Sequence, residues 1–390
     1  METLKIALVD LSRGFGGGQV ALANLAHVLS RRNHEVHVIL GTENIHSRLS
    51  ELCTPCSLHK IRGYSNIFEF RDIAQQTKKD ILHLDKKHKF DVIDVQGVNG
   101  LFIPSQLRGK LIVTLHGNNA QRGLDLLRFT FKTSDMSIAV SHAAKNFLRN
   151  VSGHLLFGRF EKKACQNARL VLTLTPTEAY YATKNYSISQ EKIRVVPNVI
   201  IDLKTNSSHI PHIPQDKQVI LSVGALEFIK GTPILAKTME YVLSTEDVVY
   251  VSVGDGPLMG CVKKLQGKFP KRVVILPHLS TSLSSVYASA SLLVQASLYE
   301  SFGLSMAEAM LAGKPVVAFR LASIPDLIAD EFTGLLAKPL SSKDLAIKVI
   351  NLIRDKERAC ELGFNARKVV NELYNVESVG NRVESVLKEV

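Results

Sequence analysis

The chain has 390 residues, 45% of them hydrophobic and 22% charged, and it carries a formal net charge of +12. This length predicts two or three domains of about 150 residues each, and the composition excludes a disordered or collagen-like chain. Its apolar runs are too short for a membrane-spanning helix of roughly 20 residues, and its first residues lack the apolar region of a signal peptide, so we expect a cytoplasmic protein.

Short apolar runs alternate with helix-length segments along the first half of the chain. The runs lie at residues 5–9, 36–40, 92–95, 111–115, 138–140 and 170–174. Continuous apolar strands of this kind are typical of parallel sheets that helices cover on both faces. We therefore predict a doubly wound α/β domain over residues 1–201.

A glycine-rich segment at residues 14–19 (GFGGGQ) follows the first predicted strand and precedes an amphipathic helix at residues 20–29. A dinucleotide fingerprint requires glycine where Gln19 stands, which weakens a nicotinamide-cofactor interpretation. Gly16, Gly17 and Gly18 would let the backbone and the helix N–H groups approach a ligand closely. A tight turn without a ligand is the alternative.

The five cysteines are spread along the chain, which favours a reducing compartment over a disulfide framework. Cys53 and Cys56 form the one pair at a metal-binding or redox spacing. A structural zinc site needs four ligands, and no second pair or nearby group of histidines completes one. We interpret these two residues as ordinary thiols.

Almost all of the excess positive charge lies in the first half of the chain. Residues 1–200 hold 27 Lys and Arg against 16 Asp and Glu, a net charge of +11, whereas residues 201–390 hold 21 against 20. A predicted helix with an apolar stripe of Ile73, Thr77, Ile81 and Leu84 carries a cluster of lysines. Its members are Lys78, Lys79, Lys86, Lys87 and Lys89.

Two interpretations of this lysine cluster stay open. One is a solvated helix face, and the other is contact with an anionic membrane surface, where each basic residue contributes about 1 kcal/mol. Binding to nucleic acid is not expected, because the chain has no Trp and its few aromatic residues do not alternate with basic ones.

Residues 202–218 contain Pro and Ser and lack an apolar period, which predicts a linker. After it, apolar runs at 219–223, 248–253, 273–276, 292–295 and 316–319 predict a second doubly wound domain over residues 219–372. We expect residues 373–390 to form a helix that packs back towards the first domain. In such folds ligands bind outside the carboxyl ends of the strands, so a cleft between the two domains is the expected active site.

Two glycine-rich turns follow strands of the second domain. The first runs from Gly224 to Lys230 and Gly231 and leads into a helix at Thr232, so Lys230 lies beside free N–H groups and the positive end of a helix dipole. This arrangement predicts a phosphate site, with a solvated lysine as the alternative. Gly254 begins the second turn, which by itself indicates only a change of direction.

The segment 295–318 predicts a strand, a loop with Glu300, and a helix from about Gly303 to Gly313 that carries Glu308. The loop carboxylate could accept hydrogen bonds from sugar hydroxyls and the helical one from a ribose, while the N–H groups of Phe302, Gly303 and Leu304 bind phosphate. An amphipathic helix with two solvent-facing glutamates is one alternative. A glycosidase-like pair of carboxyl groups, which would have to lie about 5–5.5 Å apart, is another.

Taken together, these motifs resemble the retaining glycosyltransferases of family 4, whose two Rossmann-like domains form the GT-B fold around a central cleft. The matching segments are the glycine-rich first loop, residues 113–117 (VTLHG), 223–231, 254–257 (GDGP), and the pair of Glu300 and Glu308. The resemblance implies a nucleotide-sugar donor held by the second domain and an acceptor held by the first. It implies neither a cofactor nor a metal.

Carried over by position, the resemblance makes Lys230 the partner of the donor diphosphate and Glu308 that of the ribose. Glu300 would lie near the donor sugar, with the amides of Ser301, Phe302, Gly303 and Leu304 close to the phosphate and sugar. His116 would lie beside the transferring sugar.

The glycines carried over from the family are Gly16, Gly17, Gly18, Gly224 and Gly254, which would line the donor site. The family usually has arginine where this chain has Ala225, which removes one phosphate partner. Gln19 stands where glutamate is frequent, and Ala322-Ser323 replaces a common Gly-Gly.

The sequence therefore predicts transfer of a sugar from a UDP- or GDP-type donor to an acceptor hydroxyl, with retention. The basic first half indicates an anionic, lipid-linked or glycan acceptor, with the enzyme in the cytoplasm or at the inner face of the membrane. A nucleotide-sugar epimerase on the same fold is one alternative, and a non-catalytic protein that binds nucleotides or a membrane surface is the other.

Overall fold

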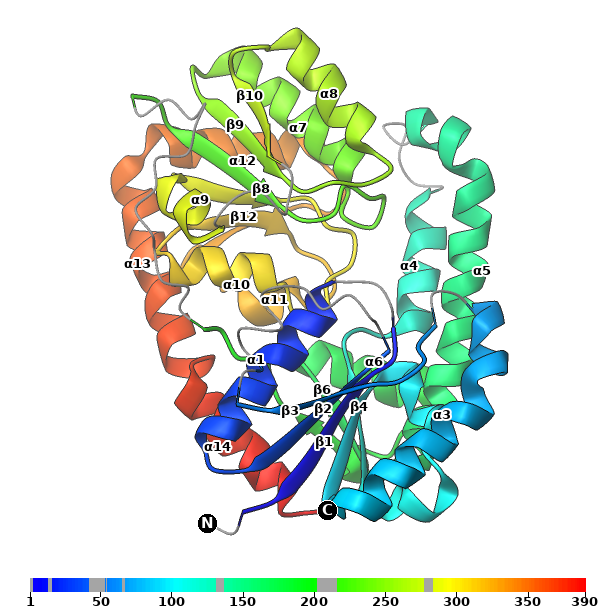
Figure 1. The fold of residues 1–390 in the computed structure, drawn as a ribbon. Coiled ribbons are helices and arrows are strands. Elements are labelled where there is room, and N and C mark those ends of the chain that lie inside the picture. The colour runs from blue at the N-terminus through cyan, green and yellow to red at the C-terminus, as the bar shows by residue number, and fades with distance from the viewer. Residues whose placement is uncertain are drawn as a thin grey trace. The chain divides into compact units, whose positions relative to one another are not determined.

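The computed structural model describes residues 3–12, 16–41, 53, 55–64, 67–130, 137–201, 216–276 and 283–390 (Figure 1). Its contacts divide the chain into two compact units. Unit 1 comprises Met1–Leu124, Asn150–Ile201 and Tyr374–Val390, and unit 2 comprises Asp125–Arg149 and Asp202–Leu373. Most of the predicted linker, residues 202–215, lies outside the described residues.

Unit 1 contains a parallel sheet of seven strands in the order β3-β2-β1-β4-β5-β6-β7. The strands are β1 Lys5–Asp10, β2 Glu35–Leu40, β3 Ser57–Lys60, β4 Val92–Gln96, β5 Leu111–Leu115, β6 Leu170–Thr173 and β7 Ile193–Val195. Alternate residues of β1 enter two different cores, since Ala7 and Val9 pack on one face and Ile6 and Leu8 on the other. Both faces of the sheet are therefore covered, as continuous apolar strands predict.

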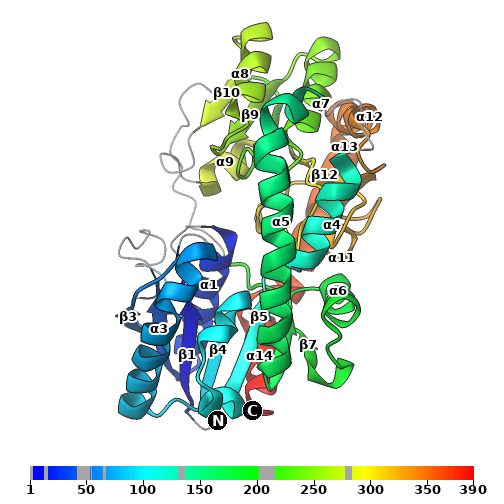
Figure 2. The same cartoon turned by 90° about the vertical axis from the view of Figure 1, so that its right-hand side faces the viewer.

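Helices of unit 1 cover these two faces. They are α1 Gly17–Arg31, α3 Ile67–His88, α6 Pro176–Tyr186, α14 Val376–Leu387, and those parts of α4 Asn119–Thr130 and α5 Ser137–Asn167 that belong to unit 1, residues 119–124 and 150–167. The 3₁₀ turns of unit 1 are η1 Gly97–Phe102, η2 Ser105–Lys110 and η4 Gln190–Lys192. Helices α4 and α5 lie side by side (Figure 2), where Gly158 approaches the backbone of Ala120.

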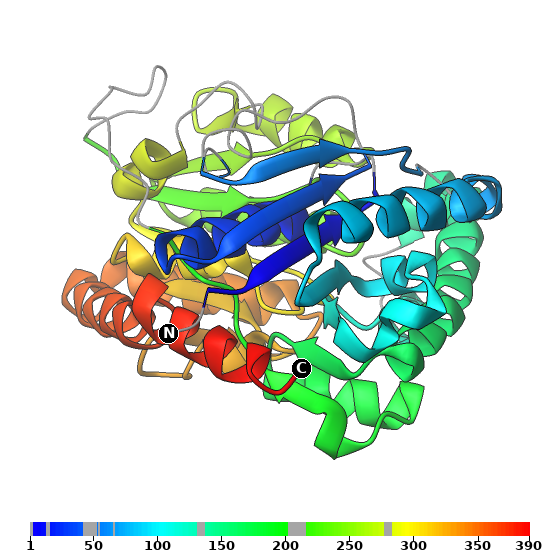
Figure 3. The same cartoon turned by 60° about the horizontal axis from the view of Figure 1, so that its bottom comes forward.

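Helix α14 returns the end of the chain to α1 of unit 1 (Figure 3). Val379 and Val383 of this helix join the core beneath α1. Beside them Arg32 Nη1 donates a hydrogen bond of 2.8 Å to Glu384 Oε2. Apolar burial and a half-buried ion pair therefore both attach α14 to α1.

Unit 2 contains a parallel sheet of six strands in the order β10-β9-β8-β11-β12-β13. The strands are β8 Val219–Val223, β9 Val249–Val253, β10 Val273–Leu276, β11 Leu292–Gln295, β12 Val316–Phe319 and β13 Gly334–Ala337. The helices are α7 Thr232–Thr245, α8 Met259–Lys268, α9 Leu283–Ser289, α10 Leu304–Leu311, α11 Ile324–Leu327, α12 Ser342–Arg354 and α13 Lys356–Leu373. The α/β prediction of two parallel sheets with alternating helices is confirmed.

One predicted strand is wrong, because residues 138–140 lie inside helix α5. A run of three apolar residues cannot distinguish a strand from a turn of helix. Strands β3, β7 and β13 were not predicted. β3 is mostly exposed and β7 has three residues, so neither has the continuous apolar run of a buried strand. None of the described helices is both long and apolar enough to cross a membrane.

Candidate active site

The strand order of unit 2 reverses between β8 and β11, which are neighbours although they are not consecutive in the chain. In an open parallel sheet, ligands bind outside the carboxyl ends of the strands at such a point. The segment after β8 contains Lys230, and the segment after β11 contains Glu300. The topology thus brings together two residues that lie 70 positions apart.

Lys230 Nζ donates a hydrogen bond of 2.7 Å to Glu300 Oε1. The Glu300 side chain is 9% exposed and that of Lys230 is 31% exposed, so the carboxylate is buried while the ammonium group reaches solvent. Ser297 Oγ donates to the same oxygen at 2.7 Å, and Gln295 Nε2 donates to Ser297 Oγ at 2.8 Å. Gln295 Nε2 also lies 3.4 Å from Glu300 Oε1, so three side chains hold Glu300, whereas Lys230 can turn towards an anion.

A backbone contact fixes the two segments against each other. Leu298 N donates to Ile229 O at 2.8 Å. Gly231 has φ +66°, and a Cβ added there would lie 1.9 Å from Ala296 O. Only glycine fits this position, because the left-handed conformation and the close approach both exclude a side chain.

The two helices that begin beside this pair have glycine N-caps, Gly231 for α7 and Gly303 for α10. No side chain of the described residues caps either helix. The first N–H groups of a helix and its dipole attract an anion. The start of α10 contains the four residues whose amides the sequence predicts to lie close to phosphate and sugar, Ser301, Phe302, Gly303 and Leu304.

Glu308 lies in the second turn of α10, where Tyr287 Oη donates a hydrogen bond of 2.9 Å to its Oε2. The two glutamates are thus carried by different elements, Glu300 by a loop and Glu308 by a helix. Each is oriented by its own hydrogen bonds.

Gly224 and Gly254 end two adjacent strands, β8 and β9, and both have a positive φ, +150° and +133°. A Cβ on Gly254 would lie 2.0 Å from Gly224 O. Gly224 N also donates to Val253 O at 3.0 Å. These glycines allow the two strand ends to touch through their backbones. Ala225, which replaces the arginine usual in the family, is exposed.

In unit 1, His116 follows β5, and its ring faces Gly18 at the start of α1, where an added Cβ would lie 3.7 Å from the ring. Desolvation lowers the pKa of His116 to about 4, so the imidazole is neutral at physiological pH. Its Nε2 is buried without a hydrogen-bond partner among the described residues. Gly16 is the N-cap of α1, and Gly17 begins the helix.

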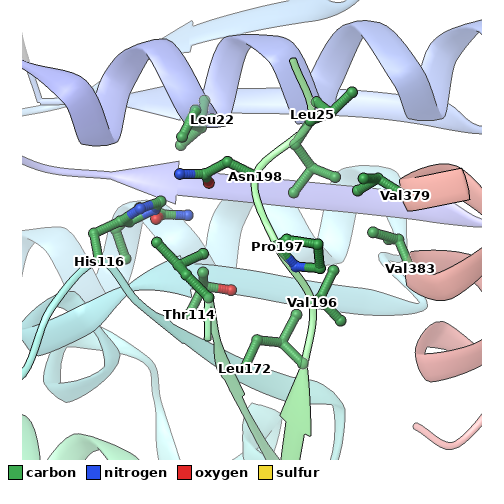
Figure 4. A pocket seen from close by; sticks show the side chains of 14 residues that line it. Leu22, Leu25, Thr114, His116, Leu172, Val196, Pro197, Asn198, Val379 and Val383 are labelled. Atoms are coloured by element: carbon green, nitrogen blue, oxygen red, sulfur yellow. The ribbon is translucent and has the colours of Figure 1, made fainter. Parts of the chain in front are cut away.

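A cavity of about 30 Å³ lies next to His116 inside unit 1 (Figure 4). Figure 4 shows Thr114, His116 and Asn198 at one side of it, and Val379 and Val383 of α14 at the other. A volume of this size holds about two water molecules.

Near this cavity Asp94 of β4 is buried, and Thr114 Oγ1 donates to its Oδ1 at 2.6 Å. Burial raises the pKa of Asp94 to about 7, because a charged carboxylate is costly in an apolar environment.

The lysines predicted for a surface helix lie on α3. Ile73, Thr77 and Ile81 are buried as the apolar stripe predicts. The exposed face of the helix carries Lys78, Lys79, Lys86 and Lys87, and Lys89 lies just beyond the end of the helix. Each of these five side chains is exposed, which fits either a solvated face or a surface contact.

Several residues around the site were missed by the sequence analysis. Gln295 and Ser297 form the hydrogen-bonded support of Glu300, and their signal was the appearance of polar residues at the end of an apolar strand. Tyr287, which orients Glu308, had no signal in the sequence, because only the tertiary structure brings α9 to α10. Gln19, which the sequence marks only as a departure from the expected glycine or glutamate, is 3% exposed, and its Nε2 donates to Ser12 O.

Two family models match the chain, one in each part. The model described as Glycosyltransferase Family 4 matches residues 15–154, and the model described as Glycosyl transferases group 1 matches residues 204–369. The chain belongs to the family-4 glycosyltransferases. It is therefore an enzyme of the glycosyltransferase class with the GT-B fold.

Relatives and solved structures agree with this family over nearly the whole chain. The N-acetyl-alpha-D-glucosaminyl L-malate synthase of Bacillus anthracis is 23% identical over 96% of this chain and 94% of its own. The sucrose-phosphate synthase of Thermosynechococcus elongatus has a TM-score of 0.75 at 20% identity, covering 99% of this chain and 98% of its own. The Anabaena protein HepE in complex with UDP-glucose has a TM-score of 0.73 at 19% identity, covering 99% and 100%.

Proposed function

We propose that this glycosyltransferase moves a sugar from a nucleoside-diphosphate sugar, with UDP as the first candidate, to an acceptor hydroxyl with retention of anomeric configuration. The observation that carries the proposal is the Lys230–Glu300 pair beside the uncapped start of α10, at the carboxyl ends of β8 and β11. Two similar proteins support a nucleotide-sugar donor: one is named for an N-acetylglucosaminyl product, and the other was solved in complex with UDP-glucose.

In the proposed reaction the bond between the anomeric carbon and the diphosphate oxygen breaks, and the acceptor oxygen forms a bond to the same carbon. Lys230 and the N–H groups of α10 stabilise the negative charge that develops on the leaving diphosphate. The acceptor attacks from the side of the departing phosphate, which takes up the acceptor proton. No carboxylate is needed as a nucleophile in this scheme.

The remaining residues have positioning roles in this proposal. Glu300, held by Ser297, accepts hydrogen bonds from donor sugar hydroxyls, and Glu308, oriented by Tyr287, accepts them from the ribose. His116 is neutral and contacts the transferring sugar with its half-buried ring. Gly16, Gly17, Gly18, Gly224 and Gly254 let the backbone approach the donor.

We further propose that the acceptor is anionic or membrane-held, with the exposed lysines of α3 facing it. Lys78, Lys79, Lys86 and Lys87 would each contribute on the order of 1 kcal/mol at an anionic lipid surface. In this proposal the enzyme acts at the inner face of the membrane, where a lipid-linked or glycan acceptor would be presented.

A donor panel followed by an acceptor screen tests the proposal. UDP- and GDP-sugars are added to the full chain, and a donor at about 100 times its Kd should stabilise it by about 2.7 kcal/mol, read as a rise in Tm. With that donor, free nucleotide should appear only when an acceptor is present. A changed sugar still attached to nucleotide would instead identify an epimerase, and failure of every nucleotide to raise Tm would refute donor binding.

Two glutamate variants, one inside the candidate site and one outside it, test whether this turnover depends on the site. Glu300→Gln should abolish transfer, while Glu357→Gln, an exposed glutamate on α13, should leave transfer unchanged. Full transfer by Glu300→Gln would contradict the proposed role of the loop carboxylate.

A further inference from the structure

Three histidines meet at the edge of the unit 1 sheet, and none of them has a role assigned above, although His88 directly follows Lys87 of the exposed lysine face of α3. His37 lies on β2, His59 on the edge strand β3, and His88 is the last residue of α3. One ligand nitrogen from each ring lies within 4.8 Å of those of the other two. Of the three side chains His37 is buried and the other two are half-buried.

The sheet register explains how residues far apart in the sequence come together. In the parallel pairing of β2 and β3, His37 is opposite Ser57 and Ile39 is opposite His59. His37 and His59 are thus diagonal neighbours on one face of the sheet, since residues two positions apart in a strand share a face. Helix α3 ends over this face and supplies His88.

The hydrogen bonds define which nitrogen atoms are available. His37 Nε2 lies 2.9 Å from Glu35 Oε1, and because a carboxylate oxygen accepts hydrogen bonds, His37 Nε2 is the donor in this contact. The lone pair of His37 therefore lies on Nδ1, which accepts a hydrogen bond of 2.8 Å from His59 Nε2. When a metal ion replaces this proton, His59 Nδ1 takes up a proton and Nε2 becomes free to bind the ion.

The third histidine supplies an independent observation. His88 Nε2 is buried and has no hydrogen-bond partner among the described residues. A buried polar atom without a partner destabilises the folded state, because it has lost its hydrogen bonds to water. A ligand that accepts its lone pair would remove this destabilisation.

We propose that His37 Nδ1, His59 Nε2 and His88 Nε2 bind a divalent transition metal ion of the zinc class, with solvent as the fourth ligand. Imidazole nitrogens suit zinc, copper and nickel, and zinc accepts three histidines with an open fourth position. Glu35 is the carboxylate partner that a metal-bound histidine usually has on its other nitrogen. Zn–N distances of about 2.0–2.1 Å place the three nitrogens about 3.3 Å apart, between the 2.8 Å of the His37–His59 contact and the 4.8 Å limit of the cluster.

Such an ion would join β2, β3 and α3 at one point. Strand β3 is a four-residue edge strand with mostly exposed side chains, so its own packing contributes little to holding it in the sheet. The site would therefore stabilise this edge of unit 1 and would have no part in sugar transfer.

Metal uptake by the full chain tests the proposal. Protein stripped with EDTA, dialysed against ZnCl₂ and desalted should retain one zinc per chain, and Co²⁺ in its place should give the visible absorption of a tetrahedral site. His88→Gln should abolish retention. His83→Gln, an exposed histidine of the same helix, is the matched control and should retain the ion.

Two further variants keep the test decisive if His88→Gln fails to fold. Glu35→Gln changes a half-exposed residue outside the ligand set and should weaken zinc binding by about 10- to 100-fold. Cys56→Ser should leave retention unchanged, which separates this site from the nearby thiols. Absence of zinc above background in the wild-type chain, or equal retention by the His88 and His83 variants, would overturn the proposal and leave a hydrogen-bonded histidine cluster.

Discussion

Replacing either partner of the ion pair between Lys230 and Glu300 should change the affinity for a free nucleoside diphosphate, and the two replacements should act in opposite directions. Lys230 must leave Glu300 before its ammonium group can bind a diphosphate, so the carboxylate and the ligand compete for it. Removing the charge of Glu300 should therefore release Lys230 for the ligand, whereas removing Lys230 should leave the ligand without its cation.

The size of each change in UDP affinity follows from the exposure of Lys230 and from the charge on its binding partner. The Lys230 side chain is 31% exposed, so its ion pair lies near the weak end, about 0.5–1 kcal/mol. Glu300→Gln should thus tighten UDP binding by roughly 2- to 5-fold while it abolishes transfer. Charge-assisted bonds to phosphate contribute about 1.5–3 kcal/mol, so Lys230→Ala should weaken UDP binding by roughly 10- to 150-fold.

Isothermal titration of UDP into the wild type and the two single variants measures both effects, and the double variant completes the cycle. UDP lacks the sugar that is transferred, so contacts between Glu300 and that sugar do not enter the comparison. If Glu300→Gln weakens UDP binding as much as Lys230→Ala does, the two groups act together on the diphosphate and the competition inferred from the structure is refuted.

Three other predictions concern backbone strain, pH and nucleotide recognition. Gly231→Ala should lower the free energy of unfolding by more than about 2 kcal/mol, because its Cβ would meet Ala296 O. Gly267→Ala, in α8 with open space around it, is the control and should raise the free energy of unfolding by about 0.5–1 kcal/mol. Equal effects of the two variants in urea unfolding would contradict the steric reasoning. Burial raises the pKa of Asp94 in the folded state to about 7 from its ordinary value of 3.8, so the folded state binds more protons and the contribution of Asp94 to the free energy of unfolding should fall by about 3 kcal/mol between pH 5 and 8. Asp94→Asn should remove this fall, and a wild-type curve that stays flat would show that the carboxyl ionises at its ordinary pKa. Tyr287→Phe, which removes the hydrogen bond to Glu308, should weaken UDP binding several-fold and leave pyrophosphate binding unchanged; an equal loss for both ligands would place Glu308 at the phosphates.

The sequence predicts secondary structure best where the structure of a residue depends on its neighbours along the chain. Buried strands such as β8 and β11 were recognised because both faces are apolar, and the start of α10 because Gly303 precedes a helical period. Strand β3 was missed because an exposed edge strand has no such pattern. The segment 138–140 was misassigned because three apolar residues fit a strand and a helix equally well.

What the sequence could not supply is the set of contacts created by strand order. Once β11 is placed beside β8, Lys230 reaches the carboxylate of Glu300 from 70 positions away, while Ser297 holds the same carboxylate from within its own loop. The same reasoning applies to the histidines, because only the pairing of β2 with β3 makes His37 and His59 neighbours. Sequence spacing singles out Cys53 and Cys56 as metal-ligand candidates. It does not reveal ligands that come from two parallel strands and the end of a helix. Spacing rules therefore find sites built on one loop or helix, and sites at sheet edges have to be found in the fold.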